Sequence, residues 1–148
     1  MKAPNVFISY SHDSPEHRIE VLGLSNRLRE DGVDAHLDWY EDSPPEGWPA
    51  WMQTQIRNAT FVVVVCTEVY RRRAMGEEAA GRGLGVRWES GAITQAIFDS
   101  EGKNYKFIPV ILRDSDRAAI PDYLRGATFY NVGESDGYEA LLRHLTRQ

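Results

Sequence analysis

The sequence predicts an α/β domain with a mainly parallel sheet, because strand-like and helix-like segments alternate from end to end. Its most apolar segment, FVVVVC at Phe61–Cys66, has no polar face and is typical of a central strand covered on both sides. With 148 residues, 42% of them hydrophobic, the chain is long enough to bury a core without disulfides or metals. One domain spanning residues 1–148 is therefore expected.

Five segments are expected to form the strands of this sheet. Right-handed crossovers between them predict the order 2-1-3-4-5, with a crevice at the carboxyl ends of the first and third strands. Ligands of open parallel sheets bind at such a reversal of strand order. The predicted strands are Val6–Tyr10, Val33–Asp38, Phe61–Cys66, Phe107–Leu112 and Ala127–Val132.

The expected helices lie between these strands. Ser14 is suited to cap a helix that has Pro15 at its first position and ends at Gly32. Apolar residues at helical spacing and turn residues mark the remaining helices. These are marked by Trp48, Met52 and Ile56, by Glu89–Asp99, by a short segment at Pro121–Arg125, and by Tyr138, Leu141, Leu142 and Leu145.

Two connections are longer than such a fold requires, which favours a functional role for both. Trp39–Pro49 contains three prolines and one glycine, and is expected to be a shaped loop. Thr67–Trp88 contains four glycines and is expected to be a loop that acts as a mobile lid.

Composition narrows the class of protein. A net charge of −5 and a pI near 5.4 disfavour direct binding to nucleic acid or to an anionic membrane. No secretory signal and no apolar run of about 20 residues is visible, so we expect a cytoplasmic protein without a membrane partner. The single cysteine, Cys66, is expected to be a buried small hydrophobe.

Several familiar sites are not supported by the sequence. It has no GxxxxGK[ST] or GxGxxG phosphate loop, no GxSxG elbow and no HExxH motif, and no metal site is expected. A response-regulator site is disfavoured, because the first strand ends in Ser9-Tyr10-Ser11 rather than in acids, and Arg113 rather than lysine follows the fourth. The four histidines stand at unrelated spacings and are expected on the surface or satisfied locally.

Glu89 is the candidate catalytic residue. It begins a helical stripe with Ile93, Ala96 and Ile97, so its carboxylate is directed toward the core, where charge is costly. One carboxylate is enough to cleave NAD, because nicotinamide leaves its ribose as a neutral molecule and needs no general acid. The alternative is a helix-capping role, in which an acid contributes about 0.3 to 1 kcal/mol.

The sequence also resembles a known family over nearly its whole length. NVFISYSHDSPEH at residues 5 to 17 is similar to the opening of TIR-like domains, and specifically of their SEFIR branch. FVVVVCTEVY at 61 to 70, GVRWE at 85 to 89 and FIPVIL at 107 to 112 resemble SEFIR features in the same order. The resemblance implies a flavodoxin-like, three-layer fold with a five-stranded parallel sheet.

The resemblance implies two functional classes. Some TIR-like domains hydrolyse NAD or cyclise its ADP-ribose part with a glutamate at the position of Glu89. NAD is then the substrate, with no prosthetic cofactor. Gly85 stands where many catalytic TIR domains have tryptophan, while Trp88 adjoins the acid. The expected substrate-binding residues, from the resemblance and the predicted crevice, are Ser9, Tyr10, Ser11, Asp38, Trp48, Thr67 and Trp88.

Other TIR-like domains are adaptors that only assemble, and homotypic self-association is expected in either class. A third alternative is an enzyme similar to nucleoside deoxyribosyltransferases, which use a glutamate nucleophile on a related bond. Bacterial SEFIR and TIR domains commonly adjoin sensor or effector domains, so the resemblance also implies a role in bacterial immune signalling as part of a larger protein.

Overall fold

The computed structural model describes residues 3–11, 13–37, 54–74, 106–121, 124 and 128–147, with backbone only at 73 and 74. Residues 54–58 are helical. The other elements follow in chain order, with α for helices, β for strands and η for a 3-10 helix. They are β1 (Asn5–Ser9), α1 (Pro15–Glu30), β2 (Asp34–His36), β3 (Phe61–Val65), α3 (Glu68–Ala74), β4 (Phe107–Ile111), η2 (Asp114–Ala119), β5 (Tyr130–Asn131) and α5 (Ser135–Leu145).

The five strands form one parallel sheet in the order β2-β1-β3-β4-β5, which confirms the predicted order. The central strand β3 pairs with β1 on one side and β4 on the other, with Ser9 of β1 opposite Val64. All five residues of β3 are buried, as its unbroken apolar sequence predicts. β5 is shorter than predicted, with two residues in the sheet.

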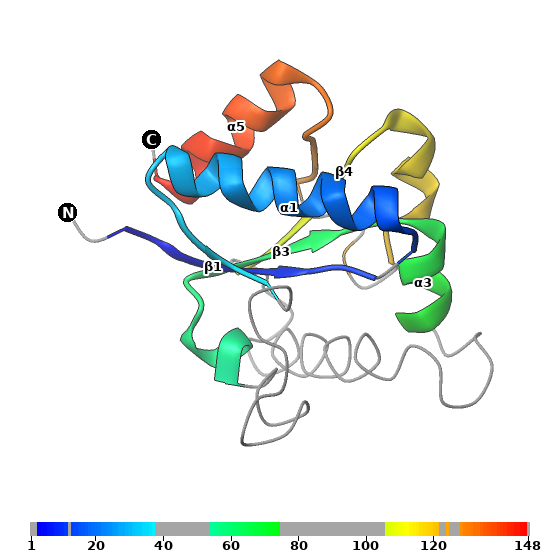
Figure 1. The fold of residues 1–148 in the computed structure, drawn as a ribbon, viewed down its shortest axis with the longest axis horizontal. Coiled ribbons are helices and arrows are strands. Elements are labelled where there is room, and N and C mark those ends of the chain that lie inside the picture. Colours follow the sequence, from blue (N-terminus) through cyan, green and yellow to red (C-terminus); the bar gives the residue numbers. More distant parts are fainter. Residues whose placement is uncertain are drawn as a thin grey trace.

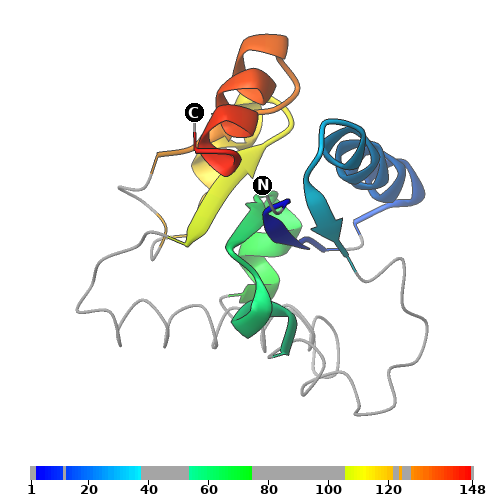
Figure 2. The ribbon, with the colours of Figure 1, turned by 90° about the vertical axis from the view of Figure 1, so that its left-hand side faces the viewer.

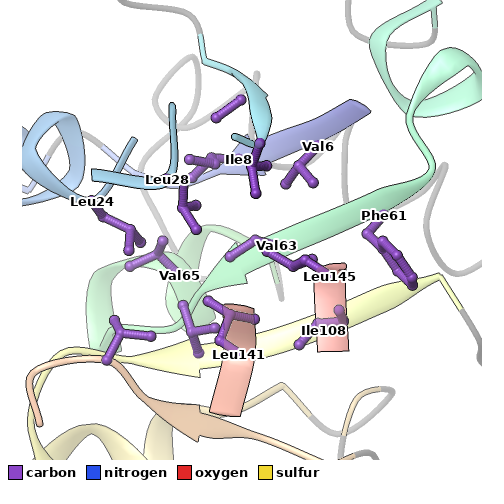
Figure 3. Packing of buried hydrophobic residues seen from close by; sticks show 14 of the residues in the cluster. Val6, Ile8, Leu24, Leu28, Phe61, Val63, Val65, Ile108, Leu141 and Leu145 are labelled. Carbon is purple, nitrogen blue, oxygen red and sulfur yellow. The ribbon is translucent and has the colours of Figure 1, made fainter. Parts of the chain in front are cut away.

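Helices cover both faces of the sheet (Figures 1 and 2). Side chains alternate along a strand, so Val63 and Val65 of β3 pack in one core while Val62 and Val64 pack in the other. The first core lies under α1 and α5, and Figure 3 shows its strand and helix side chains in contact. The second core includes Ile56 and Tyr70 from the opposite helical layer. The fold therefore has three layers.

The ends of α1 agree with the sequence signals. The Ser14 hydroxyl accepts a hydrogen bond from the His17 backbone N–H at 3.0 Å, and Pro15 is the first helical residue. Gly32, just after the helix, has a φ of +94°, a conformation that glycine adopts without strain. Val21, Leu24 and Leu28 form the buried stripe, and each such side chain contributes roughly 1.5–3 kcal/mol when fully buried.

One prediction about a connection is wrong, and one connection holds an element that was not predicted. Thr67–Trp88 is not a loop throughout, because α3 occupies Glu68–Ala74. The Thr67 hydroxyl accepts a hydrogen bond from the Tyr70 backbone N–H at 3.1 Å, which is the geometry of a helix cap. A 3-10 helix that was not predicted, η2 at Asp114–Ala119, also follows β4. Of the short helix predicted at Pro121–Arg125 the structure describes Pro121 and Leu124, and Leu124 is in a 3-10 turn whose backbone N–H donates to the Pro121 carbonyl at 2.9 Å.

Gly137 of α5 is required by close packing of backbone against backbone. A Cβ at this position would overlap the carbonyl oxygen of Asn131 and lie 2.7 Å from its carbonyl carbon. We expect Gly137→Ala to lower the free energy of unfolding by about 1–3 kcal/mol, as overpacking does. Urea denaturation followed by circular dichroism measures this change.

The matched control is Gly23→Ala in α1, where an added Cβ would meet no atom within 4 Å. This variant should gain about 0.5–1 kcal/mol, because alanine is the better residue inside a helix. Equal effects of the two substitutions would contradict the proposed close approach at Gly137.

Candidate functional site

Four hydroxyl-bearing side chains meet where β1 and β3 end, at the predicted crevice. The Ser9 hydroxyl lies 2.8 Å from the Tyr70 hydroxyl, and the Ser11 and Thr67 hydroxyls are 3.4 Å apart. The Ser11 hydroxyl also donates a hydrogen bond to the Asp13 carboxylate. We refer to Ser9, Ser11, Thr67 and Tyr70 as the hydroxyl cluster. The structure thus brings together three of the predicted substrate-binding residues.

The hydroxyl cluster is buried, and its members bond to one another or to nearby groups. None of its four residues is more than 6% exposed. Tyr10 belongs to the opposite face of the sheet, because it packs in the core under α1 and α5. Its ring centroid lies 6.4 Å from that of His17. Tyr10 and the two serines therefore do not line one common surface, and their contact with substrate stays a prediction.

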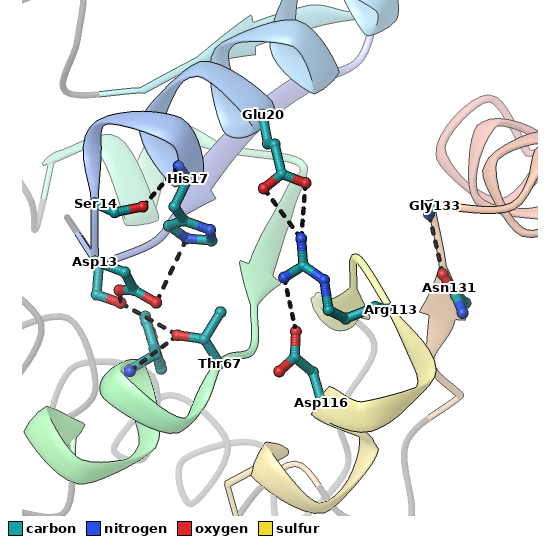
Figure 4. A network of polar contacts seen from close by, with 11 residues as sticks. Asp13, Ser14, His17, Glu20, Thr67, Arg113, Asp116, Asn131 and Gly133 are labelled. Atoms are coloured by element: carbon teal, nitrogen blue, oxygen red, sulfur yellow. Dashed lines mark hydrogen bonds and ion pairs between the residues drawn. The ribbon is translucent and has the colours of Figure 1, made fainter.

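A second group of polar residues joins α1 to the segment after β4 (Figure 4). One guanidinium nitrogen of Arg113 lies 3.1 and 3.0 Å from the two carboxylate oxygens of Glu20, and the other lies 3.6 Å from an Asp116 oxygen. His17 Nε2 lies 4.0 Å from an Asp13 oxygen. We call Asp13, His17, Glu20, Arg113 and Asp116 the charged cluster.

Asp116 is the member of the charged cluster with a shifted pKa. Burial raises the pKa of its carboxyl above the ordinary value of 3.8, and Coulombic interactions with Arg113 and His17 oppose this rise. Its side chain is 17% exposed. Desolvation therefore outweighs the ion pair at this residue.

Cys66 follows β3 directly and is fully buried, as the sequence predicts. Burial raises the pKa of its thiol to about 12, so almost none of it is thiolate at neutral pH. It is a packing residue rather than a nucleophile. Within the described ranges, no group of three or more His, Cys, Asp or Glu side chains is placed to hold a metal ion.

Four predicted site residues, Glu89 and three substrate-binding residues, lie outside the described residues. The three are Asp38, Trp48 and Trp88. Gly85 and the loop Trp39–Pro49 also lie outside them.

Most of the polar network was not predicted from the sequence. The capping role of Thr67 had a signal, because TEVY places a threonine three residues before Tyr70 at a helix start. The contact between Arg113 and Glu20 had none, since 93 positions separate them. His17 was expected to be exposed or locally satisfied, and it is buried beside Asp13.

The fold, with the hydroxyl cluster at the carboxyl edge of its sheet, defines the class of protein. A parallel sheet in the order 2-1-3-4-5, with helices on both faces, is the architecture of TIR-like domains. The TIR domain of a Toll-related receptor from Hydra magnipapillata superposes with a TM-score of 0.66 at 17% sequence identity. That comparison covers 97% of this chain and 99% of the other, and it establishes the fold alone.

The chain belongs to the SEFIR family, because the family model for the SEFIR domain matches residues 4–145. The crystal structure of a prokaryotic SEFIR domain is 32% identical, with a TM-score of 0.71 and coverage of 97% of this chain and 99% of that one. Human interleukin-17 receptor D is 26% identical over an aligned length of 158 residues, and the alignment covers 96% of this chain. The chain spans about a fifth of that receptor, 21% of its length.

Among the residues that the structure describes, no helix is long and apolar enough to cross a membrane.

The bond between Ser9 and Tyr70 joins β1 to α3 in the second core. We expect Tyr70→Phe and Ser9→Ala each to lower the free energy of unfolding by about 0.5–1.5 kcal/mol, because each removes one partner of this buried hydrogen bond. The double variant should lose less than the sum of the two, since it leaves neither hydroxyl behind. Urea unfolding of the four proteins gives the coupling energy. A coupling energy of zero would mean that this bond does not stabilise the fold.

Asp116 gives a prediction for pH dependence. Its pKa is raised in the folded protein, so between the ordinary value of 3.8 and the higher folded value the folded state binds more protons than the unfolded chain. Its contribution to stability therefore falls as pH rises through this window. We expect the stability of Asp116→Asn, relative to the natural chain, to increase from about pH 3 to about pH 6.

Chemical denaturation across that pH range measures the difference. The matched control is Asp136→Asn, an exposed residue in the first turn of α5. A relative stability of Asp116→Asn that decreases with pH would show that ion pairing, rather than burial, dominates at Asp116.

Proposed function

We propose that this SEFIR domain acts by self-association and that the assembled form cleaves NAD between nicotinamide and ribose, with Glu89 as the catalytic carboxylate. The observation that carries the proposal is the polar edge formed by the hydroxyl cluster. It lies at the carboxyl ends of β1 and β3, where the strand order reverses. Ligands of open parallel sheets bind at this place.

In the sequence, α3 follows β3, and Glu89 comes after α3. The Glu89 carboxylate is the candidate group, because the sequence predicts that it begins an apolar helical stripe. None of the described carboxylates in the chain after β3 has such a position. The buried hydroxyls act differently in this proposal. Their bonds to one another and to Asp13 hold the backbone at the strand ends in one geometry, and this fixes the edge of the sheet at which NAD binds in the proposal.

The chemistry requires one anion. The bond between the ribose C1′ and the pyridinium nitrogen breaks, and its electron pair moves to the nitrogen, so nicotinamide leaves neutral. The positive charge that develops on the ribose is stabilised by the Glu89 carboxylate. Water then adds to C1′ and releases a proton, which gives ADP-ribose. Attack by a nitrogen of the adenine ring gives a cyclic product instead.

A second candidate is an adaptor that assembles without catalysis. The observation that favours it is the mutual bonding of the hydroxyl cluster, which leaves these groups engaged within the domain. Similarity to interleukin-17 receptor D over 96% of this chain also supports a signalling role. Under this candidate Glu89 only stabilises the start of its helix. Homotypic SEFIR contacts are then the whole function.

The test is release of nicotinamide from NAD by protein at increasing concentration, with self-association measured in the same samples by sedimentation. We expect release to rise with assembly, and Glu89→Ala and Glu89→Gln to reduce it at least about a hundredfold, the typical effect of removing a group that stabilises transition-state charge. Glu139→Ala, which removes an exposed acid on α5, is the matched control and should retain full activity. Mass spectrometry distinguishes ADP-ribose from a cyclic product.

Three outcomes separate the candidates. Assembly without nicotinamide release would support the adaptor and exclude NAD cleavage. Release that persists in Glu89→Gln would exclude Glu89 as the catalytic group. Turnover of deoxynucleosides in place of NAD would identify the third alternative, an enzyme similar to nucleoside deoxyribosyltransferases.

A further inference from the structure

The outward face of α1 carries an exposed aliphatic side chain, Ile19, one helical turn before a glycine, Gly23. Ile19 is 63% exposed and is the one large hydrophobic side chain left exposed among the described residues. A single exposed aliphatic side chain is ordinary. Gly23, however, stands one helical turn later on the same face, and a Cβ built there would meet no atom within 4 Å. The gap at Gly23 is therefore not required for packing within this chain.

Gly23 also stands at the edge of a cavity. The cavity has a volume of about 230 Å³ and runs between α1 and the segments that follow β4 and β5. This volume is several times the roughly 30 Å³ that one water molecule occupies, so an aliphatic side chain has room there. Apolar side chains form much of its lining, including Leu24, Leu112, Val132 and Tyr138.

Charges on the same helix face are distributed in a complementary way. Glu16 lies in the first turn of α1, and Arg27 lies in its last turn. The guanidinium of Arg27 stacks on the Tyr138 ring at 3.6 Å, which holds this cation at the rim of the cavity. The midpoint between Glu16 and Arg27 along the helix almost coincides with the midpoint between Ile19 and Gly23. A two-fold axis at that point therefore relates both pairs.

The geometry points to an isologous contact in which α1 of one copy packs antiparallel on α1 of a second copy. Ile19 of each copy sits over Gly23 of the other, at the mouth of the cavity, and Glu16 of each copy faces Arg27 of the other. A contact of this kind is self-complementary, as a two-fold dimer requires. The absence of a side chain at Gly23 lets the two helices approach closely.

This inference deepens the proposed function, because it names the surface through which self-association occurs. A pair of short helices buries a small area, so the contact is weak and forms at high local concentration. That property suits a domain whose activity depends on assembly.

Disulfide trapping tests the contact directly. Ile19→Cys and Gly23→Cys are prepared as separate proteins, mixed in equal amounts and oxidised. We expect the mixture to give the mixed disulfide several-fold more than either protein alone gives its own dimer, because residue 19 faces residue 23 across the axis. Intact mass identifies the mixed species. Cys66, the single natural cysteine, contributes little background because it is buried.

The matched control is a mixture of Ile19→Cys with Glu139→Cys, which places the second thiol at an exposed position of α5. It should not exceed background. Sedimentation equilibrium gives a second measurement. Gly23→Ala and Ile19→Ala should each weaken self-association several-fold, while thermal unfolding shows that both remain folded and that Gly23→Ala is more stable. A purely structural role for Gly23 would leave association unchanged.

The outcomes distinguish this inference from the proposed function. If the natural chain self-associates but forms no mixed disulfide, and if both alanine variants associate normally, the α1 contact is wrong and self-association stands. If the natural chain remains monomeric at every concentration, both proposals fail.

Discussion

The burial of β3 on both faces is the constraint on which the rest of the structure depends. A strand whose five residues are all buried needs a partner on each edge and a helical layer on each face. β1 and β4 supply the edges in parallel register. Parallel strands need crossover connections, and these place α1 and α5 on one face and α3 on the other (Figure 2). The three-layer fold follows from this one apolar segment.

The same register determines what meets at the carboxyl edge. Ser9 lies opposite Val64, so Ser11, two residues later, lies beside the turn that contains Thr67. Because side chains alternate across the sheet, both serines point to the layer of α3 while Tyr10 points to α1. Buried hydroxyls without partners would cost about 1–3 kcal/mol each, and here they satisfy one another. The edge is consequently polar, and its hydroxyl groups have partners within the domain.

The parts of this arrangement that follow from local chemistry were predictable from the sequence. An unbroken apolar strand, a Ser14-Pro15 helix start and the right-handed crossover rule together predicted the sheet order and the first helix. The four glycines after residue 75 predicted a loop over the whole of Thr67–Trp88. The cap formed by Thr67 and the helix that follows it were therefore not predicted. The charged cluster was not predictable. Arg113 meets Glu20 only because β4 ends, and α1 begins, at the same edge of the sheet, and sequence spacing carries no information about that contact.

α1 contributes both to the charged cluster and to the contact inferred between two copies. Its inward side carries His17 in the charged cluster, and its outward side carries Ile19 and Gly23. Glu20 belongs to both, because it bonds to Arg113 and also lines the cavity beside Gly23. A second copy seated at that cavity would remove water from the half-exposed Glu20–Arg113 pair, which strengthens the Coulombic attraction between the two charges and also carries a desolvation cost.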